Sequence, residues 1–170
     1  MCSSDLFTPF DRAMAAAPAD MRFLWNITTA RPDSMKTGSA HVAKLSYLPT
    51  RPDAYAAFVR AAVARYGRKG LNGHAPVKYW QVDNEPAPFK GRSYVELVRL
   101  TAKAIKEADP EAKVVLGGVA GFAPAPAYIK GFDEVFRPYL RQLGGKGFDV
   151  FDLHWFGNAA GDYKDLGPVV

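Results

Sequence analysis

The chain contains a single cysteine and only three histidines among its 170 residues. One cysteine excludes a disulfide bond within the chain and a zinc site built from cysteines. The histidines, His41, His74 and His154, are widely separated, and none belongs to the His-Glu-x-x-His pattern of a catalytic zinc site. His41 and His74 fall in predicted loops and are expected at the surface. We therefore predict no metal and no cofactor.

Long apolar runs are also missing. No stretch of the sequence approaches the roughly 20 apolar residues that a membrane-spanning helix requires. The alanine-rich stretch 13–19 is short and follows acidic and basic residues, unlike the ordered regions of a signal peptide. We therefore predict no membrane partner, while the localisation of the parent protein stays open.

The positive charge is modest and dispersed. Lys and Arg number 22 against 17 Asp and Glu, which gives a net charge of +5. An anionic polymer such as nucleic acid is one interpretation of this excess. However, the one basic cluster, Arg65, Arg68 and Lys69, lies at the end of a predicted helix, where cations suit the helix dipole. No RNA-recognition or zinc-finger spacing occurs, so we predict no nucleic-acid partner.

The chain alternates predicted strands and helices. Apolar segments with strand composition are found at 22–28, 77–83, 113–116 and 148–153. Apolar residues at steps of three and four predict helices over about 52–66, 93–108 and 132–143. Right-handed crossovers make such a chain a parallel sheet. A doubly wound sheet and part of a TIM (β/α)₈ barrel both remain open, although no Gly-x-Gly-x-x-Gly pattern supports a dinucleotide fold.

Local signals mark the ends of these elements. Pro52 suits the first turn of a helix, and Gly67 fits the position just past its end. Ser93 and Glu96 form a capping box. Pro138 is expected to kink the last helix. The glycine pair 117–118 is expected to end the third strand.

The most informative segment runs from Tyr79 to Pro86. It places Asn84 and Glu85 where a predicted strand meets its following loop, the edge at which parallel α/β folds bind ligands. Crowding by Trp80 should desolvate Glu85 and raise its pKa. A carboxylic acid that stays protonated near neutral pH can protonate a glycosidic oxygen. The Asn84 amide is suited to hold a sugar hydroxyl.

The order of these motifs resembles clan A glycoside hydrolases. The resemblance rests on Asn84-Glu85-Pro86, Asp109-Pro110, Gly117-Gly118 and the segment from Phe148 to His154, and it covers about Met21 to Gly157. The nearest patterns are family 39, with β-xylosidases and α-iduronidases, and family 5, with cellulases. The resemblance implies an α/β fold that is a partial TIM (β/α)₈ barrel, with parallel strands alternating with helices and corresponding to barrel strands 3 to 6.

The resemblance also implies the roles of individual residues. Glu85 would be the general acid/base of a retaining hydrolase, and Asn84 would bind the hydroxyl next to the anomeric carbon. His154 would touch the substrate or orient a carboxylate, and Trp155 would offer a stacking face. Packing in the core is the alternative for both.

Three further residues are candidates for the substrate site. Trp25 and Asn26, near the end of the first predicted strand, are expected to line it, although packing explains Trp25 equally well. Phe89 is expected to flank a sugar subsite. The expected partner is therefore a carbohydrate substrate.

Two acidic positions stand apart from this pattern. Asp83 occupies a place where relatives often have a bulky residue. It either faces the cleft, where it would raise the pKa of Glu85, or pairs with a basic residue behind the barrel. Asp152 is positioned to reach the cleft, but the resemblance gives it no nucleophile role. A retaining enzyme needs its nucleophile about 5–5.5 Å from the acid, and the resemblance places it on barrel strand 7, outside this chain.

The chain is therefore expected to be an enzyme fragment that is hydrolytically inactive or nearly so and is poorly soluble or self-associating. Residues 1–20 are expected to be non-native or poorly ordered, since residues 1–6 resemble the translation of a sequencing-adapter tail. Residues 21–170 would form the partial barrel, from a parent protein that is secreted or periplasmic if it follows similar hydrolases. The alternatives are a carbohydrate-binding barrel without hydrolysis and a doubly wound domain with a phosphate ligand at Gly117-Gly118.

Overall fold

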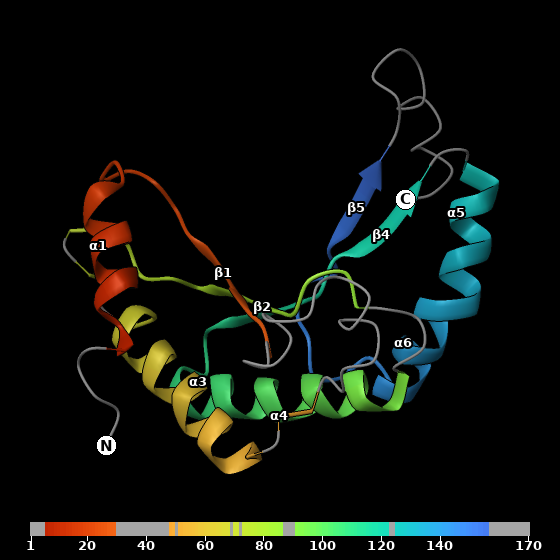
Figure 1. The fold of residues 1–170 in the computed structure, drawn as a ribbon, viewed down its shortest axis with the longest axis horizontal. Helices are drawn as coiled ribbons and strands as arrows, with labels where there is room; N and C mark the ends of the chain where they lie inside the picture. The colour runs from red at the N-terminus through yellow and green to blue at the C-terminus, as the bar shows by residue number, and fades with distance from the viewer. Residues whose placement is uncertain are drawn as a thin grey trace, which may run out of the picture.

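The computed structural model describes residues 6–29, 48–49, 51–68, 70–71, 73–86, 91–122 and 125–156. The fold is mixed α/β, with parallel strands and intervening helices (Figure 1). In chain order the elements are α1 (Thr8–Ala16), β1 (Leu24–Ile27), α3 (Pro52–Tyr66), β2 (Tyr79–Val82), α4 (Gly91–Ala108), β3 (Lys113–Leu116), β4 (Val119–Phe122), α5 (Ala125–Gly131), the π-helical segment η4 (Phe132–Phe136), α6 (Arg137–Leu143) and β5 (Leu153–Phe156). None of the helices in these ranges is long and apolar enough to cross a membrane.

The strands pair in the order in which they occur along the chain. Strands β1, β2 and β3 form a parallel sheet in which Trp25 faces Trp80 and Trp80 faces Val114. Strands β4 and β5 form a second parallel pair. A bridge between Val115 and Val150 joins the two groups of strands. The predicted parallel α/β arrangement is therefore confirmed.

The region around the glycine pair differs from the prediction. Strand β3 does end before Gly117-Gly118, but the chain resumes directly afterwards as β4. The last strand, predicted at 148–153, is β5 at Leu153–Phe156, so that prediction was wrong in position. Four steps separate Val115 from Val119, whereas three separate their partners Val150 and Leu153. The glycine pair thus holds one extra residue, which interrupts the ladder as a bulge does.

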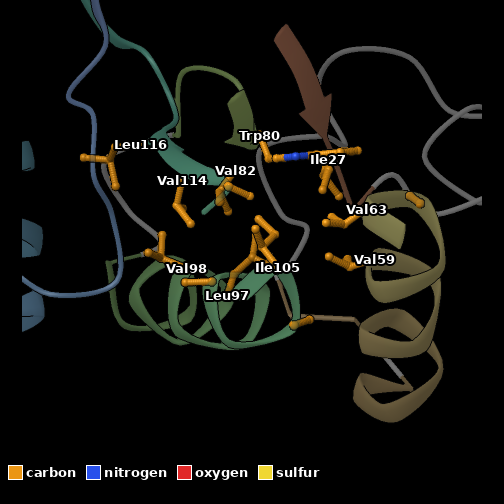
Figure 2. Packing of buried hydrophobic residues seen from close by; sticks show 14 of the residues in the cluster. Ile27, Val59, Val63, Trp80, Val82, Leu97, Val98, Ile105, Val114 and Leu116 are labelled. Atoms are coloured by element: carbon orange, nitrogen blue, oxygen red, sulfur yellow. The ribbon is translucent and has the colours of Figure 1, made fainter. Parts of the chain in front are cut away.

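The core lies between one face of the sheet and the two helices α3 and α4 (Figure 2). Strand alternation sends Trp80 and Val82 to the same face, where both are fully buried. The facing apolar side chains come from both helices: Val59, Val63, Leu97, Val98 and Ile105. Each fully buried aliphatic side chain contributes about 1.5–3 kcal/mol by leaving water. This packing fixes the sheet on α3 and α4.

On the opposite face of the three-stranded sheet, the first residues of the strands are exposed, whereas Gln81 and Val115 are buried. Leu24 and Tyr79 are paired across β1 and β2, and they are 51% and 48% exposed. The same face carries Asn26 and Gln81, two residues further along each strand. Polar side chains therefore gather on the open face toward the carboxyl ends of the strands.

The last predicted helix is interrupted as Pro138 suggested. It begins earlier than expected, at Ala125, and changes to π-helical geometry over Phe132–Phe136 before α6 begins at Arg137. Pro138 has no N–H, and its ring crowds the carbonyl of Glu134 four residues earlier. A π-helical turn widens the helix at that point and relieves the clash. Gly144, with a left-handed φ of 63°, ends α6.

Two ion pairs join the C-terminal end of α4 to residues that precede strands β2 and β5. Lys78 Nζ lies 2.7 Å from Asp109, and Lys106 Nζ lies 2.9 Å from Asp149. Burial raises the pKa of Asp109, but the Lys78 ammonium and the Glu111 N–H outweigh it and hold that pKa below its usual range. Burial likewise raises the pKa of Asp149, and its backbone hydrogen bond together with Lys106 lowers it overall.

Helix α1 lies within residues 1–20, which were expected to be non-native or poorly ordered. Phe7 and Met14 are buried in the common core. Asp11 accepts hydrogen bonds from Arg65 and from the Tyr66 hydroxyl, the latter at 2.6 Å. Residues 7–16 are thus packed against α3, whereas residues 1–5 lie outside the described range. His74, expected at the surface, is only 5% exposed, and its ring meets Phe23 edge-on; His41 lies outside the described residues.

Candidate active site

The site begins at the turn that follows β2. Asp83 and Glu85 have φ values of 63° and 45°, the left-handed region that residues with a Cβ atom rarely adopt. Asp83 offsets part of this cost locally, because its Oδ1 accepts a hydrogen bond of 2.8 Å from the Asn84 N–H. Strained backbone of this kind clusters at functional sites. The turn carries the Glu85 carboxylate to the carboxyl end of the sheet.

A histidine joins Glu85 to a second carboxylate. His154 Nδ1 lies 2.8 Å from Glu85 Oε1, and His154 Nε2 lies 3.1 Å from Asp152 Oδ2. The three side chains are 27–34% exposed, so the group is partly buried but open to solvent. Glu85 follows β2, whereas His154 lies in β5, 69 positions later. The fold therefore assembles the carboxylate–imidazole–carboxylate group from distant segments.

Two amide side chains extend this group across the strand ends. Gln81, 6% exposed, donates from Nε2 to Asp152 Oδ2. Asn26 donates from Nδ2 to Gln81 Oε1 at 2.8 Å and to the Asp83 carbonyl at 3.0 Å. The Asn26 amide thus holds both a side chain and the strained turn. The network runs from β1 through β2 to β5.

The missing side chains of the glycine pair leave room for the His154 ring. A Cβ atom at Gly118 would lie 2.2 Å from His154 Nε2, so no larger residue fits under the ring. A Cβ atom at Gly117 would lie 2.6 Å from the Val82 carbonyl oxygen. The Tyr94 hydroxyl donates to that carbonyl at 3.1 Å and accepts from the Gly117 N–H at 2.9 Å. Close approach to backbone requires glycine at position 117, whereas a larger residue at position 118 would displace the His154 ring.

Electrostatics favour the charged form of His154. The hydrogen bond with Glu85 raises the pKa of His154; burial lowers it, and the Asp152 carboxylate raises it further, so the pKa lies above its usual value. The imidazolium then places one positive charge between two carboxylates and donates a hydrogen bond to each. The group is suited to holding and moving a proton.

The other predicted site residues occupy different surroundings. Asn84 is exposed at the turn. Trp25 lies on the helix-covered face, 4.4 Å from the Tyr66 ring and 5.6 Å from the Trp80 ring, which is the packing role that the sequence left open for it. Phe89 lies outside the described residues.

Trp155 faces helix α5. Its ring meets that of Tyr128 at 5.7 Å in an edge-on arrangement. Its buried Nε1 has no hydrogen-bond partner among the described residues. Strand alternation therefore separates Trp155 from His154, which lies on the side of Gly118 and Glu85.

No role was predicted for Gln81 from the sequence. For Asp152, the prediction was only that its side chain could reach the cleft. Gln81 carried one signal, because a polar side chain between Trp80 and Val82 in an apolar strand needs a partner. Within the part of the chain that the structure describes, no group of three or more His, Cys, Asp or Glu side chains is arranged to hold a metal ion.

No protein-family model matches the chain, and no curated protein is significantly similar to it. Its function is therefore inferred from the geometry of this site and from the sequence pattern around Asn84 and Glu85.

Proposed function

We propose that this chain is part of a retaining glycoside hydrolase with a (β/α)₈ barrel, in which Glu85 is the general acid/base. The observation that carries the proposal is the Glu85 carboxylate itself. It lies at the carboxyl end of a parallel strand, on strained backbone, with an imidazole nitrogen 2.8 Å away. In TIM barrels this end of the strands forms the active site.

The strand order supports the barrel over the doubly wound alternative. Strands β1, β2 and β3 follow one another without a reversal, and the segment that leads into β5 is joined to β3 in parallel by the Val115–Val150 bridge. Helices α3 and α4 cover the same face of the sheet. A doubly wound sheet places helices on both faces and binds ligands where the strand order reverses.

The glycine pair argues against the phosphate-site alternative. A phosphate bound there would need free backbone N–H groups. The Gly117 N–H already donates to the Tyr94 hydroxyl, and the His154 ring lies against Gly118. The pair serves close packing between strand ends.

In the proposed reaction Glu85 acts twice. Its carboxylic acid first gives a proton to the glycosidic oxygen as the bond to the anomeric carbon breaks and the nucleophile attacks. The resulting carboxylate then removes a proton from the water that releases the covalent intermediate. Asn84, exposed beside Glu85, is available to bind the neighbouring sugar hydroxyl.

The test compares leaving groups in the hydrolase that contains this chain. Glu85→Gln should lower kcat/KM by roughly 10²- to 10⁴-fold on oligosaccharides, whose leaving oxygen needs a proton. Aryl glycosides with acidic leaving groups should lose much less in the first step. Glu134→Gln, a change at a surface glutamate 64% exposed, is the matched control and should leave both rates unchanged.

Three results would count against the proposal. An equal loss on both substrate types would remove the acid role from Glu85. Full activity of the Glu85→Gln variant would remove any catalytic role. Oligosaccharide binding without turnover by the unmodified protein would favour the carbohydrate-binding barrel instead.

A further inference from the structure

The hydrogen bonds of the polar network behind Glu85 run in a defined direction from donor to acceptor. Asn26 donates to Gln81 Oε1, which fixes the Gln81 amide with its Nε2 toward Asp152. Asp152 Oδ2 thus receives a donor from Gln81 on one side and faces His154 Nε2 on the other. A carboxylate only accepts hydrogen bonds when ionised, so the proton of that contact belongs to the histidine.

The same geometry leaves the other ring nitrogen facing Glu85. With Nε2 protonated, the 2.8 Å contact between Nδ1 and Glu85 Oε1 has two forms. In one, an imidazolium donates to a carboxylate; in the other, a carboxylic acid donates to a neutral imidazole. Both forms contain the same number of protons, and one proton transfer converts one into the other.

We propose that Asp152, oriented by Gln81, is a positioning residue that holds a proton on His154 Nε2 and thereby makes Nδ1 the atom that exchanges a proton with Glu85. Transfer from Nδ1 to Oε1 turns an imidazolium and a carboxylate into a neutral imidazole and a carboxylic acid. Under the proposed function, on which this inference rests, that acid then protonates the leaving oxygen. His154 becomes the store of the catalytic proton.

The two carboxylates compete unequally for the histidine proton. Asp152 is held by the buried Gln81 amide and loses little freedom when it accepts from Nε2. Glu85 and Asp152 are similarly exposed, at 34% and 29%, so the difference between them lies in the Gln81 amide that holds Asp152. Among the described residues, Glu85 and Asp152 are titratable side chains that hydrogen-bond to the ring, and Gly118 on its other side adds no charge. Neutral His154 should therefore keep its proton on Nε2.

The test follows the imidazole nitrogens by ¹⁵N NMR in the ¹⁵N-histidine-labelled chain, with signals assigned by His154→Gln. The unmodified protein should titrate above the midpoint of a free imidazole and should be the Nε2–H tautomer once neutral. An Nδ1–H tautomer in the unmodified protein would overturn the proposal without any variant. This outcome is decisive even where a variant fails to fold.

Variants separate positioning from general structure. Asp152→Asn should lower the His154 midpoint and remove the tautomer preference, and Gln81→Met should remove the tautomer preference. Glu85→Gln should lower the midpoint and keep Nε2–H. Asp149→Asn changes a carboxylate of the same segment that contacts Lys106 and the Val114 N–H instead, and it should alter neither property. Unchanged tautomer and midpoint in folded Asp152→Asn would refute the inference.

The readout is independent of turnover. The predicted tautomer in a protein that hydrolyses no glycoside would reject the proposed function alone. An active hydrolase with an Nδ1–H tautomer would reject the role of Asp152 alone.

Discussion

Gly118 offers a way to disturb the site without removing any of its polar atoms. A Cβ atom there would lie 2.2 Å from Nε2, 2.3 Å from Cε1 and 2.6 Å from Cδ2 of the His154 ring. Non-bonded atoms of this kind are best separated by about 3.5–4.0 Å, so Gly118→Ala forces the ring to retreat by roughly 1 Å or more. The obstacle is the far end of a side chain, so we expect the ring to move and the backbone to remain.

The size of the effect follows from the contacts that the ring makes. Its two hydrogen bonds, 2.8 Å to Glu85 and 3.1 Å to Asp152, cannot both survive a movement of that size. Overpacking of this kind costs about 1–3 kcal/mol, and the lost bonds contribute at the low end because the groups are partly exposed. Gly118→Ala should therefore lower the free energy of unfolding by about 1–3 kcal/mol.

Urea unfolding followed by tryptophan fluorescence measures this change, and ¹⁵N NMR of His154 reports the ring. Gly131→Ala is the matched control, because its added Cβ meets no atom within 4 Å and its φ of −61° is helical. That variant should gain about 0.4–1 kcal/mol. If Gly118→Ala keeps the stability and the His154 signals of the unmodified protein, the ring does not lie over Gly118 and the geometry of the site is refuted.

Three further predictions concern the rest of the fold. Tyr94→Phe removes a hydroxyl that joins two buried backbone groups, so the free energy of unfolding in urea should fall by about 1–3 kcal/mol; no change would contradict the bridge. The pKa values of Asp109 and Asp149 are lowered in the folded protein, so their stabilisation is present above the unfolded-state pKa and is lost as the pH falls through the folded-state pKa. Acid unfolding scans should show a shallower loss in Asp109→Asn and Asp149→Asn, and slopes like that of the unmodified protein would refute this. Leu24→Lys and Tyr79→Lys charge the open face of the sheet, so sedimentation should show less self-association; equal association would place the contact elsewhere.

Helices α3 and α4 were predictable because their signals are local, although α4 begins at Gly91, before the predicted capping box of Ser93 and Glu96. Helix α1 was not predicted, and α5 begins at Ala125 instead of about residue 132. The apolar stripe and the first-turn proline set the bounds of Pro52–Tyr66, and Pro138 marked the place where helical geometry changes. The third strand also had its predicted bounds at Lys113–Leu116. These features depend on residues within one or two turns of one another.

The site was predictable only in part, because its contacts join distant segments. Glu85 could be placed at a strand end from sequence, but its partner His154 depends on the register of β5, which the extra residue at the glycine pair sets. A one-residue change in register moves every side chain to the other face. For the same reason, the contact of Gln81 with Asp152, 71 positions away, left only an unexplained polar residue in an apolar strand.

The left-handed turn was not visible in the sequence at all, and its strain can be measured directly. At Glu85, with φ of 45°, a Cβ atom costs about 1–2 kcal/mol that glycine avoids. Glu85→Gly and Glu85→Ala both remove the carboxylate, so their difference in unfolding free energy isolates the backbone. Glycine should be the more stable by about 1 kcal/mol after its greater unfolded-state entropy is subtracted.

At a position within a helix, the difference in unfolding free energy between glycine and alanine should have the opposite sign. At Lys103, in the interior of α4 and 77% exposed, glycine should be less stable than alanine by about 1 kcal/mol. If alanine equals or exceeds glycine at Glu85 as well, the turn is not left-handed in solution. If the sign reverses between the two positions, the chain retains strain at the residue proposed as the general acid. Such strain persists only where the surroundings over-determine it. The Asn26 amide on the Asp83 carbonyl and the His154 ring on the Glu85 carboxylate are among the contacts that do so.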